Sequence, residues 1–278
     1  FVDAYRSVKD KIIIPTVNLE LSSPKVLVQE YVESIPLEEM SSASKDDRWA
    51  AGFVLMEFML REVFVHNLVH ADTHPGNWGF RKTGTQIQLV LYDFGSYIKL
   101  NPAHSAALKE LVFNYQNKTT CSPFDIFCFI GFDPEKLANI AHKMPAVAER
   151  MVEPLLTPAA WSPEEWDMGG VFDRILGGDA WWFRVAGPPW FLYLMRSVQG
   201  LMNGVVKLDV KIPVGRIFNE LIEELPLVML KGFPDCSKYL EGKTYLSSDC
   251  ANFLKVLVTE DGQEVVSLEM PARSVDEL

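Results

Sequence analysis

The sequence predicts an α+β fold, with short strands before Pro102 and mostly helices after it. Three observations lead to this prediction: apolar runs of strand length near the N-terminus, one long stretch of helical apolar spacing, and repeated helical patterns in the second half. The chain has 278 residues, of which 48% are apolar, so it can bury a sizeable core. We therefore expect a folded protein rather than a disordered one.

The first expected elements are two extended runs and a long helix. Residues 12–15 are β-branched and residues 25–32 are largely apolar, so both are expected to be extended and the second to be a strand. Residues 45–66 place large apolar side chains at helical spacing. Ser44 and Asp47, three residues apart, predict a capping box at the N-terminus of this helix.

Two β-hairpins and four further helices are expected beyond the long helix. Residues 78–80 and 87–92 are short apolar runs on either side of a turn at 82–85. An Asp-Gly turn at 261–262 predicts a second hairpin over residues 253–268. The expected helices lie near residues 103–116, 134–151, 190–207 and 213–224.

Charge and hydropathy argue against two classes of function. The net charge is -11 and the chain has no run of Lys and Arg, so we expect no nucleic-acid binding. The longest apolar stretch, residues 180–195, is interrupted by Arg184 and by a Gly-Pro-Pro sequence, and it falls short of the ~20 residues that a spanning helix needs. We expect no transmembrane helix in this chain, which leaves peripheral contact with a membrane open.

The cysteines point to an intracellular protein. Four cysteines are too few for a disulfide framework in a chain of this size, and none forms a C-x-x-C pair. We expect reduced thiols in an intracellular compartment. The four are Cys121, Cys128, Cys236 and Cys250.

The residues that carry chemistry lie in one loop and at the end of one strand. Residues 70–77 read His-Ala-Asp-Thr-His-Pro-Gly-Asn, and residues 93–95 read Asp-Phe-Gly. In protein-kinase-like enzymes the catalytic loop reads H-x-D with an Asn five positions after the Asp, and D-F-G follows on the next hairpin. Asp72 and Asn77 have that spacing, so the sequence indicates phosphoryl transfer.

Each motif residue has an expected role in that chemistry. Phosphoryl transfer asks the protein mainly to position groups and to neutralise charge. Asp72 is the expected base or acceptor-orienting carboxylate, and Asn77 and Asp93 are the expected Mg²⁺ ligands, since this ion prefers oxygen donors. His70 belongs to the same candidate catalytic loop, where such a residue more often braces the backbone than acts in catalysis. This chemistry predicts ATP and Mg²⁺ as cofactors.

Three sequence patterns together resemble the UbiB/ADCK (ABC1-type) family of atypical kinases. They are the H-A-D-x-H-P-G-N loop, the V-L-x-x-E-Y-V run that starts at Val26, and the L-x-D-F-G strand that starts at Leu91. The resemblance covers roughly residues 5–225. It implies a protein-kinase-like fold in which Glu30, Tyr31 and Val32 form the hinge whose backbone groups pair with adenine.

The resemblance also implies a function and a division of the chain. Family members bind nucleotide with Mg²⁺, act more readily as ATPases than as protein kinases, and support coenzyme Q or other isoprenoid-quinone lipid metabolism in mitochondria, plastids or bacteria. Partners would therefore be the nucleotide and lipid or quinone-pathway proteins. By the same likeness residues 1–36 are the end of the small lobe and the hinge, 37–240 the helical large lobe, and 241–278 a C-terminal hairpin extension.

Several parts of the family's nucleotide site would precede residue 1. These are a Gly-rich or Ala-rich loop, the strand Lys that holds the phosphates, its Glu partner and a K-x-G-Q segment. We therefore expect this chain by itself to bind ATP poorly or not at all, and we expect the full-length protein to be the enzyme. Lys9 and Lys11 lie too close to the hinge to replace the strand Lys, so both are expected to be solvated.

Other interpretations of the same residues stay open. Aminoglycoside phosphotransferases and choline kinases share a similar loop but usually lack D-F-G. A pseudokinase scaffold would use the fold for binding alone, and a metal-dependent hydrolase would use a ligand cluster. A run of aromatic residues at 161–191 either packs a helical core or lines a lipid pocket. The candidate metal cluster is His66, His70, Asp72 and His74.

Overall fold

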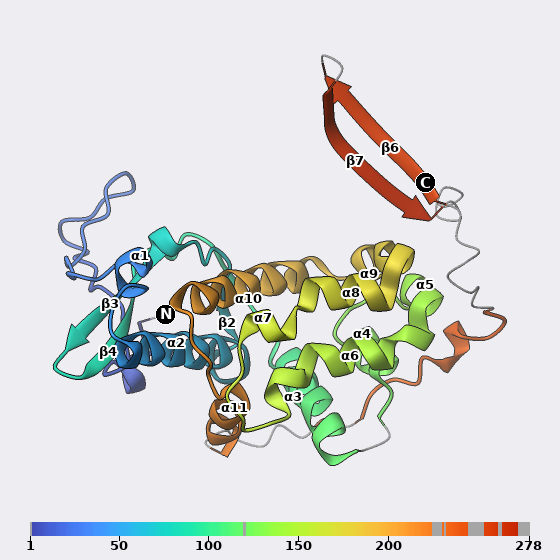
Figure 1. Ribbon diagram of the computed structural model, residues 1–278, viewed down its shortest axis with the longest axis horizontal. Coiled ribbons are helices and arrows are strands. Elements are labelled where there is room, and N and C mark those ends of the chain that lie inside the picture. The colour runs from blue at the N-terminus through green and yellow to red at the C-terminus, as the bar shows by residue number, and fades with distance from the viewer. Residues whose placement is uncertain are drawn as a thin grey trace. The chain divides into compact units, whose positions relative to one another are not determined.

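The computed structural model describes residues 2–118, 121–223, 230, 232–243, 253–260 and 263–271. It confirms the predicted mixture of helices and small sheets (Figure 1). The chain forms two compact units. The first contains Phe1–Lys109, Pro154–Trp166 and Pro189–Met229. The second contains Glu110–Glu153, Asp167–Pro188 and Leu230–Leu278.

A three-stranded sheet lies in the first unit. Its strand order is β1 (Ile12–Ile13), β4 (Gln86–Leu91) and β3 (Trp78–Thr83), with β1 parallel to β4 and β3 antiparallel to it. The predicted hairpin at 78–92 is thus confirmed. Gly84 takes a positive φ of 62° in its turn, a conformation that costs glycine little.

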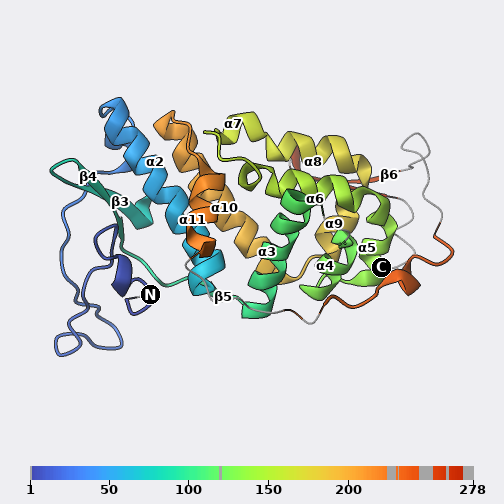
Figure 2. The same cartoon turned by 90° about the horizontal axis from the view of Figure 1, so that it is seen from below.

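The long helix is confirmed as α2 (Lys45–Leu60), continued by a π-helical turn η2 (Arg61–His66). The Asp47 N–H donates to Ser44 Oγ at 3.2 Å, which is the N-cap half of the predicted capping box. In both views α2 lies beside α10 (Pro189–Leu208), and it also contacts α11 (Val214–Glu223) and β4 (Figures 1 and 2). Two of the four further predicted helices are therefore α10 and α11.

A second, two-stranded sheet was missed in the sequence. Strand β2 (Leu68–His70) pairs antiparallel with β5 (Tyr97–Lys99), so His70 lies opposite Tyr97. The helix before it stops at Asn67, which takes a left-handed conformation with φ of 52°. Val69 packs in a buried cluster with Val63, Leu100 and Leu194, and this cluster fixes β2 in place. Three-residue strands are too short for an alternation pattern to be recognised.

The strand predicted at 25–32 is wrong. This run makes only isolated β-bridges, Ser23 with Val26 and Val17 with Gln29. It folds back on residues 16–18, for example through an Asn18 N–H bond to the Val28 carbonyl at 2.8 Å. A strand needs a neighbour along its length, which this run lacks among the described residues.

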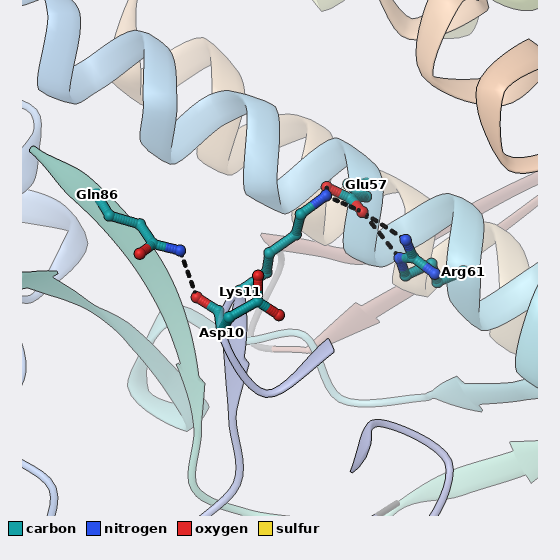
Figure 3. A network of polar contacts seen from close by, with 5 residues as sticks. All are labelled: Asp10, Lys11, Glu57, Arg61 and Gln86. Carbon is teal, nitrogen blue, oxygen red and sulfur yellow. Dashed lines mark hydrogen bonds and ion pairs between the residues drawn. The ribbon is translucent and has the colours of Figure 1, made fainter. Parts of the chain in front are cut away.

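A network of charged side chains joins β1 to α2 (Figure 3). Lys11 Nζ lies 2.8 and 2.9 Å from the two carboxylate oxygens of Glu57, and Arg61 donates to the same carboxylate from Nε at 2.9 Å and from Nη2 at 2.7 Å. Glu57 and Arg61 are buried, while the Lys11 side chain is partly exposed. The expectation that Lys11 is merely solvated is therefore wrong, because a buried carboxylate needs a paired charge. Lys9 is exposed, as expected.

The second unit is mainly helical. The predicted helix at 103–116 is α3 (Pro102–Asn117), whose residues from Glu110 onward are counted in this unit. The helix expected at 134–151 is divided, because Pro145 removes a backbone donor and clashes with the carbonyl four residues earlier. Its parts are α5 (Pro134–Leu137), η4 (Ala138–Lys143) and α6 (Met144–Val152). Three helices not expected from the sequence are α4 (Pro123–Phe129), α8 (Met168–Leu176) and α9 (Ala180–Ala186).

Aromatic rings fill the core of this unit. Phe127 contacts Phe132 and Phe183 edge-on at centroid distances of 5.0 and 6.0 Å. Trp182 is also buried. Phe183 of the aromatic run therefore packs against a ring of α4, and Trp182 is buried, as the core interpretation expects.

The predicted C-terminal hairpin is confirmed as β6 (Phe253–Glu260) and β7 (Gln263–Pro271). Its expected turn at 261–262 lies outside the described residues. The apolar stretch at 180–195 is divided between α9 and α10, which Gly187 and Pro188 separate. Among the described residues, none of the helices combines the length and apolar content that crossing a bilayer requires.

Candidate functional site

The predicted catalytic loop begins at the end of β2, where a buried carboxyl group, that of Glu62, holds it. The His70 N–H donates to the Glu62 carboxylate, and both residues are buried. Burial raises the pKa of Glu62 well above its usual value, although the hydrogen bond from His70 lowers it. Glu62 thus holds the first backbone N–H of the loop from the buried interior.

His70 links the loop to the Asp-Phe-Gly segment. Its Nε2–H donates to the Asp93 carbonyl, and its Nδ1 accepts from the Asp72 N–H at 3.2 Å. The Phe94 ring lies 5.9 Å from the imidazole. Because backbone groups engage both ring nitrogens, this geometry supports the bracing role of His70 rather than proton transfer.

Asp72 and Asn77 meet across the loop. The Asn77 amide donates from Nδ2 to Asp72 Oδ2 and to the Asp72 carbonyl, both at 3.0 Å. The other carboxylate oxygen of Asp72 lies 3.6 Å from Arg196 Nη2. Asn77 accepts at its carbonyl from the Tyr92 N–H at 2.9 Å, next to Asp93. Because Asn77 bonds to Asp72 through its amide nitrogen, its side-chain oxygen Oδ1 can serve as the expected ligand to a metal ion.

Asp93 presents an exposed carboxylate two residues after the end of β4. Its Oδ1 accepts from the Gly95 N–H at 2.7 Å, which fixes its rotamer. An exposed carboxylate and an amide oxygen are the donor types that Mg²⁺ uses alongside water and substrate phosphates. Asp93 and Asn77 therefore fit the expected metal in their chemistry, on a loop and strand that His70 holds together.

Helix α10 supports the loop from the side, which the sequence did not reveal. Thr73 Oγ1 donates to the Ser197 carbonyl at 3.1 Å, and Trp78 Nε1 donates to the Thr73 carbonyl at 3.1 Å. A Cβ at Gly200 would lie 2.0 Å from Thr73 Oγ1, so only glycine allows this approach. Small residues at 197, 200 and 204, spaced three and four apart on one helix face, were the available signal.

A pocket opens beside Asp72. Its volume is about 660 Å³, and its walls come from the catalytic loop, α1 (Leu37–Met40) and one face of α10. The loop contributes residues 72–75. The α10 face contributes Arg196, Gln199, Gly200, Asn203, Gly204, Val206 and Lys207.

The expected hinge residues lie in the irregular run before α1. The Glu30 N–H donates to the Thr16 carbonyl at 2.8 Å, and Glu30 Oε2 accepts from the Thr16 N–H at 3.2 Å. Tyr31 is 90% exposed and Val32 is buried. The Glu30 N–H is thus already bonded to the Thr16 carbonyl. Adenine pairing by the backbone of Glu30, Tyr31 and Val32 stays a prediction.

The rival metal cluster finds no support in this geometry. In the part of the chain that the structure describes, His, Cys, Asp and Glu side chains form no group of three or more that can hold a metal ion. His66 lies against Tyr5, with ring centroids 4.3 Å apart. Burial and the nearby Arg61 lower its pKa to about 4. His74 accepts from the Gly76 N–H at 3.0 Å and thereby caps the turn η3 (Pro75–Asn77).

The chain is similar in sequence to several ABC1 proteins. The alignment with "Protein ACTIVITY OF BC1 COMPLEX KINASE 8, chloroplastic" of Arabidopsis thaliana has 29% identity over 107 residues, which is 38% of this chain and 14% of that protein. "ABC1 family protein C10F6.14c" of Schizosaccharomyces pombe is 34% identical over 93 residues, 32% of this chain and 17% of that protein. "AarF domain-containing protein kinase 1" of Xenopus tropicalis is 33% identical over 88 residues, 30% of this chain and 17% of that protein. Each alignment thus spans less than a fifth of the relative.

A solved structure and a family model agree with these relatives. The Rv3197–erythromycin complex from Mycobacterium tuberculosis has a TM-score of 0.52 and 19% identity, over 80% of this chain and 55% of that one. This likeness in fold supports the predicted kinase-like architecture. The family model described as "ABC1 atypical kinase-like domain" matches residues 1–121, which include the catalytic loop and the Asp-Phe-Gly segment. Residues 1–121 are therefore similar to the ABC1 atypical kinase-like domain, the likeness that the loop and strand motifs predicted.

Proposed function

We propose that the protein to which this chain belongs is a Mg-ATP-dependent phosphotransferase or ATPase of the ABC1 type. One observation carries the proposal: Asp72, Asn77 and Asp93 belong to a single hydrogen-bonded unit. His70 bonds to the backbone of both aspartates, and Asn77 bonds to Asp72. A scaffold that only bound partners would not need this arrangement of oxygen donors.

The metal ligands of this proposal are Asp93 and Asn77. A bound Mg²⁺ would neutralise charge on the phosphates as the reaction proceeds. The chain's own contribution is to hold the two oxygen donors on adjoining backbone segments. The Gly95 N–H orients Asp93, and the Tyr92 N–H anchors the Asn77 backbone.

Asp72 has the role of positioning the attacking group and taking its proton. Its carboxylate is about half exposed and lines the pocket, so a hydroxyl or a water can reach it. The Asn77 amide holds Oδ2, which leaves Oδ1 facing Arg196. Geometry of this kind lets a carboxylate accept a proton once the acceptor lies within hydrogen-bond reach.

The biological setting is also part of the proposal. The resemblance to the UbiB/ADCK family supports a role in isoprenoid-quinone or other lipid metabolism, with quinone-pathway proteins as partners and peripheral contact with a membrane. An intracellular location in a mitochondrion, a plastid or a bacterial cell follows the same likeness. The nucleotide is the small-molecule partner, and the negative net charge argues against nucleic acid.

The test compares Asp93→Asn with Asp46→Asn in the full-length protein. Asp46 is an exposed carboxylate in the first turn of α2, away from the motif, so it is the matched control. We expect Mg-ATP to raise the melting temperature of the native protein and of the control, because a ligand that binds the folded state stabilises it. Asp93→Asn should lose this rise, and its ATP turnover should fall by about 100-fold or more. Unchanged Mg²⁺ dependence in Asp93→Asn would refute the assignment, and no shift in the native protein would favour a scaffold.

A further inference from the structure

We propose that the pocket between the catalytic loop and α10 binds the phosphoryl acceptor, and that Arg196 selects an acceptor that carries an anionic group beside its hydroxyl. This inference rests on the proposed function, because Asp72 is the reacting-side carboxylate in both. The acceptor class that it names is a small hydroxylated molecule with a phosphate or a carboxylate.

The pocket has the size and lining of a small-molecule site. Its volume of about 660 Å³ falls in the range of ordinary ligand pockets. Arg196, Gln199, Asn203 and Lys207 follow one another at spacings of three and four on α10, so they form a polar stripe on one helix face. Gln199 Nε2 donates to Asn203 Oδ1 at 2.9 Å, which orders the middle of this stripe. Asp72 stands opposite, on the loop.

The charge of the lining contrasts with that of the chain. The whole sequence carries -11, yet the residues that line this pocket include Arg196 and Lys207, with Asp72 as the acidic residue among them. Lys207 already donates to Glu38 on α1 at 2.5 Å, and this bond is the main reason why the pKa of Glu38 is lowered. Glu38 thus neutralises Lys207, and the other cation of the lining is Arg196, which faces Asp72.

The position of Arg196 suits it to bind an anion. Its contact with Asp72 Oδ1, at 3.6 Å, is longer than a hydrogen bond, and its side chain is 70% exposed. A guanidinium carries five N–H donors in a planar fork that matches a carboxylate or a phosphate. An anionic group in the pocket can therefore engage Arg196 by two parallel bonds at little cost in desolvation.

Anion binding also places the acceptor for reaction. When Arg196 turns to the anion, Asp72 Oδ1 becomes available to a neighbouring hydroxyl. That hydroxyl oxygen then forms a bond to the γ-phosphorus of ATP, the bond from phosphorus to the β,γ-bridging oxygen breaks, ADP leaves, and the hydroxyl proton passes to Asp72. A neutral acceptor would leave Arg196 beside Asp72. Arg196 thus selects anionic acceptors, because it contacts Asp72 when no anion is bound and releases Asp72 when an anion binds.

The experiment measures binding without nucleotide, by titration calorimetry on the full-length protein. The probes are glycerol 3-phosphate, glycerate and neutral glycerol, which share hydroxyl groups and differ in charge. Arg196→Gln is compared with Arg216→Gln, because Arg216 is an exposed helical arginine on α11 that faces Glu220 at 3.5 Å. We expect at least one anionic probe to bind while glycerol does not. Arg196→Gln should weaken that binding about tenfold, and Arg216→Gln should match the native protein.

Each outcome decides the proposal. Binding of both anions supports the charge rule, and binding of one alone narrows the class to phosphate or to carboxylate. Equal binding of glycerol, no binding of either anion, or equal affinities in Arg196→Gln and the native protein would overturn it. Because no ATP is present, a failure of the Asp93→Asn test removes the proposed function without changing this readout.

Discussion

The catalytic loop and the run at residues 16–32 are both irregular, yet they differ in how they are held. In the loop, Thr73 is buried and bonded to α10, and His70 bonds to Asp72 and Asp93. In the run, bonds connect mainly its own two halves, and large apolar side chains face solvent. These exposed side chains are Leu19, Leu21, Val26, Leu27 and Tyr31.

This difference shows which side of the candidate site is held in place by contacts among the described residues. The side that we propose to handle phosphate and acceptor has its supports in β2, β4 and α10, all within the first unit. The side expected to face adenine has few supports beyond Val32, although Lys11 holds the preceding strand β1 to α2. Substitutions on each side therefore should have very different effects on stability, which three predictions test.

The largest effect is expected at Glu57, which anchors β1 just before the loosely held run. Glu57→Gln keeps the volume of the side chain but leaves the buried Arg61 without a charged partner. Removing one member of a buried ion pair costs about 3–5 kcal/mol, so we expect a loss of that order in the free energy of unfolding. Urea denaturation followed by circular dichroism measures it.

Lys11→Gln is the matched control for this network. The Lys11 side chain is 42% exposed, so its loss should lower the free energy of unfolding by only about 0–1 kcal/mol. Equal losses in Glu57→Gln and Lys11→Gln would show that the buried Arg61 is not the reason for the effect.

An intermediate effect is expected at Gly200, where α10 meets the catalytic loop. In Gly200→Ala the new Cβ would lie 2.0 Å from Thr73 Oγ1 and 3.3 Å from the Thr73 carbonyl. Either the helix or the loop must move, which typically costs about 1–3 kcal/mol, partly offset by about 1 kcal/mol of helix propensity. We also expect ATP turnover to fall by about tenfold or more, because the loop positions Asp72.

Two variants separate the clash at Gly200 from a general effect of alanine. Gly169 in α8 has no atom within 4 Å of the added Cβ, so Gly169→Ala should be neutral or slightly stabilising. Combining Gly200→Ala with Thr73→Ala removes the clashing hydroxyl, so the double variant should lose less than the sum of the single losses. Strict additivity would argue that the two residues do not collide.

The motif residues were predictable because catalytic spacing is local in sequence. Asp72 and Asn77 lie on one loop, and Asp93 lies two residues after β4, a strand of a hairpin whose pattern was clear. The spacing of small residues around Gly200 indicates a close-packed helix face, but the sequence does not show that this face meets the loop. The position of Arg196 beside Asp72 depends on the same long-range packing. A periodic pattern can be recognised only over a sufficient length. The long helices α2 and α10 were therefore predicted, while the three-residue strands β2 and β5 were missed.

The strand prediction at 25–32 failed for a physical reason. The same reason predicts the smallest change in stability, at Leu27 in this run. The apolar pattern of residues 25–32 is compatible with a β-strand, but a strand forms only where another strand lies alongside to form hydrogen bonds. Leu27 is 65% exposed, so Leu27→Ser should change the free energy of unfolding by no more than about 0.5 kcal/mol. Val32→Ser, in the same run but 7% exposed, should lose about 2 kcal/mol. A loss above about 1 kcal/mol in Leu27→Ser, measured by the same urea denaturation, would mean that this run packs as tightly as the catalytic loop, and the contrast between the two regions would disappear.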